Sequence, residues 1–215
     1  MQIRRVIFIR PGETEWNRQN RWQGWLRVPL NTHGRAQVEA LAGFIRNIGV
    51  GALYTSDLQR ALETAEIITE HMDIEPILDG RLRERNIGEW QGLTQPELEA
   101  WYPEEFAAWV ADRENFTIPG GESRHNVRER MQATFDDILV QDKAQTIGII
   151  SHTVSIRTLL DNLLPDYDPL GLKLMNSSVT TVRWENEQWT SIALNDIMHL
   201  EGLETKFIKE LGDRS

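Results

Sequence analysis

The fold is decided by the stretch Ile3-Arg4-Arg5-Val6-Ile7-Phe8-Ile9-Arg10-Pro11-Gly12-Glu13-Thr14-Glu15-Trp16-Asn17. Its first half is a run of β-branched and aromatic residues, which predicts a buried strand from Ile3 to Ile9. Pro11 and Gly12 end that run, because proline lacks the backbone N–H that a central strand needs. The strand therefore delivers Arg10 to its carboxyl end.

Further along the sequence, short apolar strands alternate with amphipathic helices. Strands are predicted at Ala52–Tyr54 and Thr146–Ile150, and a hairpin pairs Val179–Trp184 with Trp189–Leu194. Apolar spacing at i, i+3, i+4 and i+7 predicts four helices. The first is capped by Thr32 and ends before Gly49, and the second is capped by Ser56 or Asp57 and runs to about His71. The third follows the Gly120-Gly121 break, and the fourth runs from about Thr153 to Leu164. This alternation predicts an α/β fold with three layers, a mostly parallel sheet carrying helices on both faces.

The length of 215 residues favours one domain that spans 1–215. The segment 93–119 is rich in Trp, Glu and Pro, a composition that fits an inserted helical cap better than a separate domain. We therefore expect a single α/β domain with a small helical cap insertion.

The overall charge limits the partners. With 33 acidic and 23 basic residues the formal net charge is −10, which argues against non-specific binding of nucleic acid or of an acidic membrane. No apolar run approaches the roughly 18 residues of a membrane span, and no leader pattern precedes the first strand, so we expect a cytoplasmic protein. Cysteine is absent, which excludes disulfides and thiolate metal sites, and we expect neither a metal nor another cofactor.

Arg10 and His152 each come just after a predicted strand. Ligands of open α/β sheets collect beyond the carboxyl ends of the strands, so we expect these two side chains in one pocket. The alternative is that Arg10 is an ordinary surface arginine and that His152 caps the helix that follows it.

The segment Arg10–Asn17 and five others, in order along the chain, resemble motifs of one protein family. Arg10–Asn17 is similar to the phosphate-site signature Arg-His-Gly-Glu-Thr/Ser-x-Trp-Asn of the histidine phosphatase superfamily, which comprises phosphoglycerate mutases and related phosphatases. The other matching segments are Arg21–Trp25, Tyr54–Ala65, Leu82–Gly92, Pro119–Ser123 and Ile150–Arg157. The resemblance covers nearly the whole chain.

The resemblance implies a role for each matching residue. Arg10 and Arg60 would hold the phosphoryl group, for which the planar guanidinium is well suited. His152 would donate to the equatorial phosphoryl oxygens, and Glu84 would protonate the leaving oxygen, a task that needs a raised pKa. Further substrate or phosphate contacts implied by the motifs are Asn17, Gln23, Gly24 and Thr153.

The branch of the family follows from a spacing. Only 68 positions separate Glu84 from His152 (152 − 84), whereas glycolytic mutases carry a longer insertion there. The chain therefore resembles the phosphatase branch, and Ser-His-Thr-Val at 151–154 is similar to the metal-independent phosphoserine phosphatases. The alternative for Glu84 is a solvated carboxylate paired with Arg83 or Arg85.

One position departs from the family pattern. Where the family carries the histidine that attacks phosphorus, this sequence has Pro11, which supplies no nucleophile. The first hypothesis is a phosphatase-like pseudoenzyme that binds a small phosphorylated molecule or inorganic phosphate with little or no turnover, as a homodimer or as the heterodimer partner of an active relative. The alternative is a functional phosphomonoester phosphatase, for example of the phosphoserine type, that uses water or a different nucleophile. A third reading is that the proline was introduced to trap a complex.

Overall fold

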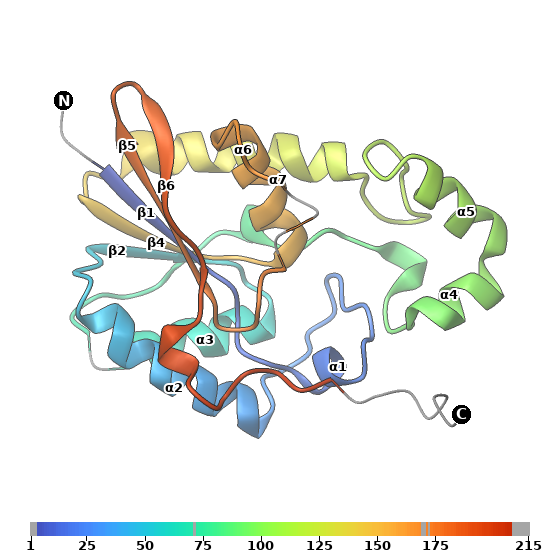
Figure 1. Ribbon diagram of the computed structural model, residues 1–215, viewed down its shortest axis with the longest axis horizontal. Coiled ribbons are helices and arrows are strands. Elements are labelled where there is room, and N and C mark those ends of the chain that lie inside the picture. Colours follow the sequence, from blue (N-terminus) through green and yellow to red (C-terminus); the bar gives the residue numbers. More distant parts are fainter. Residues whose placement is uncertain (1–3, 71, 169–170, 172, 208–215) are drawn as a thin grey trace.

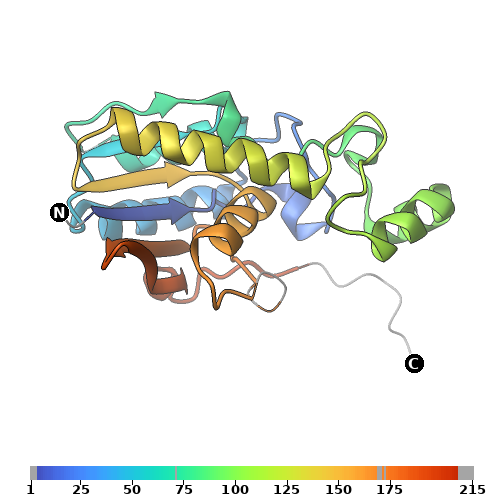
Figure 2. The ribbon, with the colours of Figure 1, turned by 90° about the horizontal axis from the view of Figure 1, so that it is seen from above.

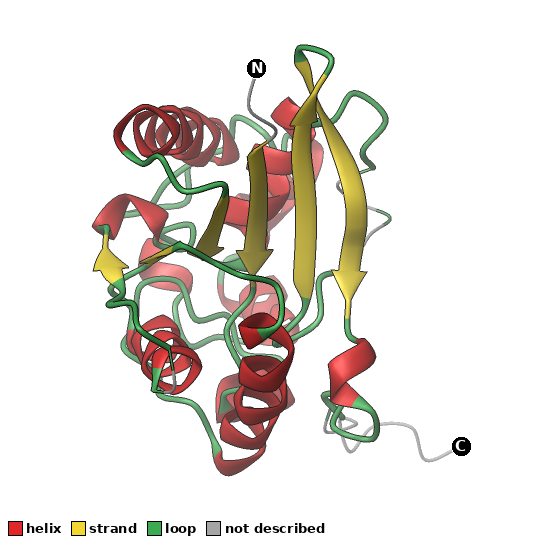
Figure 3. Ribbon diagram, turned by 90° about the vertical axis from the view of Figure 1, so that its left-hand side faces the viewer, coloured by secondary structure: helices red, strands yellow, loops and turns green. Residues whose placement is uncertain are grey.

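The computed structural model describes residues 4–70, 72–168, 171 and 173–207. Its sheet has six strands in the order β3-β2-β4-β1-β5-β6, which Figure 3 shows from the short β3 to the long β5–β6 hairpin. The strands are β1 (Arg4–Ile9), β2 (Ala52–Thr55), β3 (Ile77–Leu78), β4 (Thr146–Ile150), β5 (Val179–Glu185) and β6 (Gln188–Asp196). β1 to β4 pair in parallel, whereas β5 runs antiparallel to β1 and β6 antiparallel to β5. The prediction of a mostly parallel α/β sheet is confirmed.

Helices cover both faces of the sheet (Figure 1). One face carries α2 (Thr32–Arg46) and α3 (Gln59–Thr69), and the other carries α6 (Arg124–Gln141) and α7 (Thr153–Leu163). The period of two along β1 explains the layers, because Val6 and Phe8 pack with α6 and α7, whereas Ile7 packs with α2 and α3. Since both faces of β1 are covered, its sequence is a continuous apolar run rather than an alternating one.

The remaining helices lie beyond the sheet. The short α1 (Glu15–Arg18) follows β1, and α4 (Gln95–Trp101) and α5 (Pro103–Ala111) project from the end of the molecule opposite the β5–β6 turn (Figures 1 and 2). α4 and α5 pack on a small apolar cluster of their own around Trp90 and Ile118. Short 3₁₀ turns occur at Gly80–Leu82, Gly88–Trp90 and Met198–Leu200. No helix in the described ranges is both long and apolar enough to cross a bilayer.

The caps of two helices differ from the prediction. α2 is capped by Asn31 rather than Thr32, because Asn31 Oδ1 accepts a hydrogen bond from the Gly34 N–H at 2.7 Å. α3 begins after Leu58 and has no side-chain cap. The two residues that were predicted as caps of α3 interact with other side chains. The Asp57 carboxylate forms a salt bridge with Arg83, and Ser56 Oγ forms a hydrogen bond with His152.

Other boundaries shift less. The hairpin turn is shorter than predicted, because only Asn186 and Glu187 separate the strands, with φ of 51° and 63°. Positive φ at both positions is the geometry of a two-residue type I′ turn. β3 was not predicted at all. The predicted ends at Ile3 and His71 lie outside the described residues.

Candidate functional site

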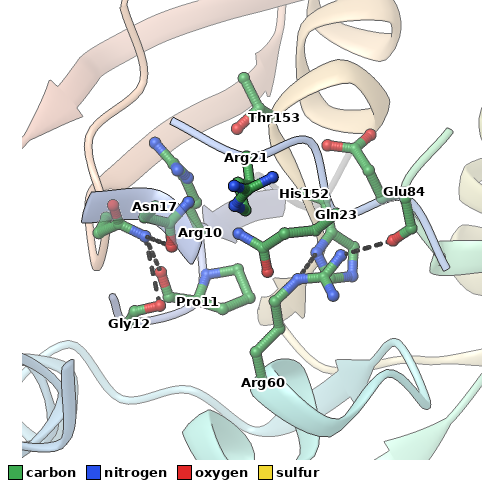
Figure 4. A pocket seen from close by; sticks show the side chains of 12 residues that line it. Arg10, Pro11, Gly12, Asn17, Arg21, Gln23, Arg60, Glu84, His152 and Thr153 are labelled. Carbon is green, nitrogen blue, oxygen red and sulfur yellow. Dashed lines mark hydrogen bonds between the residues drawn. The ribbon is translucent and has the colours of Figure 1, made fainter. Parts of the chain in front are cut away.

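A cavity of about 150 Å³ lies at the sheet edge where β1, β2 and β4 end (Figure 4). All the residues expected from the motifs line it, namely Arg10, Pro11, Asn17, Gln23, Gly24, Arg60, Glu84, His152 and Thr153. Gly12, Arg21 and Asn176 complete the wall. The parallel strands bring these residues together, because their carboxyl ends meet at one edge.

Arg10 and Arg60 give the cavity its positive charge. Of the five N–H donors of a guanidinium, Arg60 uses one for His152 Nδ1 (3.2 Å) and two for carbonyls of the 24–26 loop (2.9 and 3.1 Å). Arg10 Nη1 donates to the carbonyl of Leu174. Burial lowers the pKa of both guanidinium groups to about 10, so both remain cations at neutral pH. Their other N–H groups suit the oxygens of a phosphoryl group.

His152 is buried, with 3% of its surface exposed, and both ring nitrogens have partners. Because the Nε–H of Arg60 can only donate, His152 Nδ1 accepts, and Nε2–H donates to Ser56 Oγ at 3.0 Å. Burial, followed by the charges of Arg60 and Arg10, holds the pKa of His152 well below its usual 6.5. The imidazole is therefore neutral, and its side chain does not cap α7. A role as donor to phosphoryl oxygens stays a prediction and requires the N–H to leave Ser56.

Glu84 is bound to the first turn of α7. Its carboxylate oxygens accept hydrogen bonds from the backbone N–H groups of Val154 and Ser155 at 3.1–3.3 Å and of Arg85 at 2.8 Å. The first N–H groups of a helix have no partner within the helix, and negative charge is stabilising there. The guanidinium groups of Arg83 and Arg85 are directed to other partners, so the alternative of a simple surface ion pair is wrong.

The loop that carries Pro11 is held from the far end of the chain. The Pro11 carbonyl accepts from the Ser177 N–H at 3.1 Å and from Asn176 Nδ2 at 3.2 Å. The same Nδ2 lies 3.2 Å from the Gly12 carbonyl and 3.2 Å from Asn17 Oδ1. The Pro11 ring faces the cavity (Figure 4), and it presents neither an N–H nor a nucleophilic atom.

Asn176 and Arg21 are site residues that the sequence reasoning missed. Asn176 precedes β5, and because β5 is antiparallel to β1, its first residues lie at the edge where the parallel strands end. The polar run Asn176-Ser177-Ser178 before an apolar strand was an available signal, but it is informative only once the direction of β5 is known. Arg21 belongs to the matching segment Arg21–Trp25 but was given no role there, and the Glu97 carboxylate of α4 fixes it at 2.9 Å.

Comparison with known proteins assigns the chain to a family. A family model described as the histidine phosphatase superfamily (branch 1) matches residues 6–197. The chain belongs to this superfamily. It is 34% identical over 216 residues to phosphoglycerate mutase-like protein 4 of Arabidopsis thaliana, and the alignment covers 98% of this chain and 93% of that protein.

Solved structures of two phosphatases share the fold. A mycobacterial glucosyl-3-phosphoglycerate phosphatase complexed with VO3 has a TM-score of 0.81 and 29% identity, covering 89% of this chain and 98% of that one. A histidine-to-alanine variant of phosphoserine phosphatase from Entamoeba histolytica, in complex with phosphoserine, has a TM-score of 0.81 and 28% identity, covering 91% and 98%. In this protein, no group of three or more His, Cys, Asp or Glu side chains among the described residues is placed to hold a metal ion.

Proposed function

We propose that this protein binds phosphate monoesters or inorganic phosphate in the 150 Å³ cavity and turns the esters over slowly or not at all. One observation carries this proposal: Pro11 forms part of the cavity wall beside two buried arginines that suit a phosphoryl group. Pro11 is taken to stand where the superfamily carries the histidine that accepts the phosphoryl group.

The arginines support binding. Burial lowers the pKa of Arg60, Glu84 raises it, and the charge of Arg10 lowers it further, so an oxyanion between the two guanidinium groups would relieve their repulsion. The solved phosphoserine complex of a histidine-to-alanine variant supports the idea that a superfamily member can hold its phosphomonoester after losing a histidine.

The same cavity offers no obvious replacement nucleophile. Within the described part of the chain its wall contains one histidine, His152, and hydrogen bonds to Arg60 and Ser56 occupy both ring nitrogens. Direct attack by water remains chemically open, because the arginines would still stabilise charge in the transition state. Hydrolases stripped of their nucleophile retain roughly 10³–10⁴-fold acceleration over water, which is a small part of normal catalysis.

Several finer expectations belong with this proposal. A small phosphorylated molecule is the expected ligand, and the protein would act in the cytoplasm, as a homodimer or beside an active relative. Helices α4 and α5 would form the cap insertion at 93–119 of a single domain. An active phosphatase of the phosphoserine type is the competing function, and the experiment below separates the two.

Replacing Pro11 with histidine tests the proposal directly. We expect Pro11→His to form an acid-labile phosphoenzyme and to hydrolyse p-nitrophenyl phosphate at least about 10²-fold faster than the wild type, since a misplacement of about 1 Å already costs a factor of that size. Pro11→Ala, the matched control, also removes the proline but adds no nucleophile and should show no gain. Wild-type turnover equal to that of Pro11→His would contradict impaired catalysis, and absence of phosphate binding by calorimetry would contradict the binding role.

A further inference from the structure

A second cavity of about 440 Å³ adjoins the first. The two cavities share Gln23, Gly24, Glu84 and Thr153 as lining residues, so a ligand anchored at Arg10 and Arg60 can extend past Glu84 into the second space. Clefts of this size accommodate small-molecule ligands.

Arginines from four parts of the chain surround the second cavity. Arg85 follows the first 3₁₀ turn, Arg113 follows α5, Arg124 opens α6, and Arg157 lies in α7. Four cations around one cavity run against the net charge of −10, so their placement calls for a local explanation.

The acidic side chains near this cluster are already engaged elsewhere. Arg128 pairs with Glu114 at 3.0 Å and with Asp161 at 2.7 Å. Arg130 pairs with Glu122 at 3.0 Å. The Glu84 carboxylate, which lines both cavities, accepts hydrogen bonds from backbone N–H groups at the start of α7. Within the described ranges, none of these carboxylates forms a salt bridge with Arg85, Arg113 or Arg124.

Two of the cavity arginines, Arg85 and Arg124, form no salt bridge with a carboxylate of the described residues, although nearby carboxylates partly offset the lowering of their pKa values. Arg85 is 4% exposed, and its guanidinium donates to the carbonyls of Glu122 (2.7 Å) and Phe116 (2.9 Å), which carry no net charge. Over the ranges 4–70, 72–168 and 173–207, the Arg124 guanidinium forms neither a hydrogen bond nor a salt bridge. Burial, then the neighbouring charge of Arg124, lowers the pKa of Arg85 to about 10. Both groups are therefore cations in an unfavourable setting that a bound anion would improve.

The aromatic side of the cavity limits the shape of the ligand. Trp22 and Trp109 line it with their rings 5.4 Å apart, and the Arg113 guanidinium stacks on Trp109 at 4.7 Å. This stacking fixes a cation at the rim without using a carboxylate.

We propose that the second cavity is a subsite for a second oxyanion of the same ligand, so that this protein selects phosphomonoesters that also carry a carboxylate or another phosphate. This inference rests on the proposed function, because it requires the first phosphoryl group to sit between Arg10 and Arg60. Arg124 and Arg85 would bind the second anion, and Arg113 would close the rim.

Matched ligand pairs test the subsite by isothermal titration calorimetry at fixed ionic strength. The pairs are 3-phosphoglycerate with glycerol 3-phosphate, 6-phosphogluconate with sorbitol 6-phosphate, and fructose 1,6-bisphosphate with fructose 6-phosphate. We expect the member with the second anion to bind at least about tenfold tighter in one or more pairs, as for a charge-assisted hydrogen bond. Tighter binding of the doubly charged member in the first two pairs identifies the second anion as a carboxylate. Tighter binding in the third pair identifies it as a phosphate.

Substitutions of the cavity arginines test whether these residues cause the tighter binding of the ligands that carry a second anion. Arg124→Gln should reduce it at least threefold and leave the affinity for inorganic phosphate unchanged, and Arg113→Gln provides the same test if Arg124→Gln does not fold. Arg46→Gln removes one exposed charge from α2, on the other face of the sheet, and should change neither affinity. Equal affinity within every pair, or a preference that survives both cavity variants, would overturn the subsite and leave the phosphate site standing. No binding of inorganic phosphate would overturn the proposed function instead.

Discussion

At the scale of single residues, Glu84 has two possible tasks that one variant pair can separate. The resemblance to phosphatases implies an acid that protonates a leaving group. The structure shows a carboxylate that accepts hydrogen bonds from two backbone N–H groups in the first turn of α7 and from the N–H of Arg85. The two tasks differ in their effect on folding, because a cap stabilises the protein with no ligand present.

We expect Glu84→Ala to lower the free energy of unfolding by about 1–3 kcal/mol, because three partly buried backbone donors lose their acceptor. Glu84→Gln should cost less, since its amide oxygen can still accept. Urea unfolding with an unchanged m-value measures both effects. Glu66→Ala on the exposed side of α3 is the control and should stay within about 0.5 kcal/mol of wild type. A fully stable Glu84→Ala protein would show that the carboxylate is not a structural cap.

Residue-scale reasoning found most of the site, and the reason is geometric. Arg10 and His152 follow strands whose apolar runs are easy to recognise, so their shared edge follows from the rule for parallel sheets. Asn176 could not be found in this way, because its place depends on an antiparallel strand whose direction no local pattern records. The hydrogen-bond partners of His152 likewise depend on Ser56, which local spacing favoured as a helix cap.

At the scale of elements, the loop after β1 rests directly on the first turn of α2. A Cβ added to Gly34 would lie 2.1 Å from the Glu13 carbonyl oxygen, and one added to Gly12 would lie 2.6 Å from the Gly34 carbonyl oxygen. Both distances are far below van der Waals contact, so this approach of backbone to backbone requires glycine.

Two glycines of α2 therefore give opposite predictions for the same substitution. Gly34→Ala should destabilise the protein by about 1–3 kcal/mol or more, because the loop must move away from the helix, and it should weaken phosphate binding. Gly43→Ala should stabilise it by about 0.5–1 kcal/mol, since nothing lies within 4 Å and alanine favours the helix. Thermal unfolding with and without phosphate measures both. Similar effects of the two substitutions would show that the loop does not depend on this contact.

The helices and strands with long buried apolar patterns were predicted correctly, whereas the shortest strand was not. β4 and the core of α6 lie where the periodicity placed them, because long buried runs leave one arrangement. β3 has two residues, Ile77 and Leu78, that are 44% and 58% exposed, and it exists only through pairing with β2. Such an edge strand leaves too short a pattern to recognise.

At the scale of the whole molecule, the buried neutral imidazole of His152 couples stability to pH. Its pKa in the folded protein is lowered well below the value of about 6.5 expected for the unfolded chain. Between these two values the unfolded chain binds a proton and the folded protein does not, so stability falls as the pH drops below about 6.5. The slope from this one group is at most about 1.4 kcal/mol per pH unit.

We expect His152→Gln to flatten that part of the pH profile between pH 7.5 and 5. Urea unfolding of both proteins at several pH values gives the difference, in which the other titrating groups cancel. Added phosphate should also reduce the wild-type slope, because a bound anion favours a protonated imidazole beside it. Identical pH slopes in wild type and His152→Gln would show that the imidazole is not held neutral.

The central position of β1 also has a consequence for the order of events during synthesis. β1 pairs with β4 on one side and with β5 on the other, and Asn176 holds the loop that follows it. Asn176 is translated 166 residues after Arg10 (176 − 10), which takes roughly 8–33 s at 5–20 residues per second. During most of that interval the nascent chain presents an apolar strand whose neighbours β4 and β5 have yet to be translated. Asn176 is the lining residue that is translated last, so a chain that stalls before residue 176 has no complete cavity.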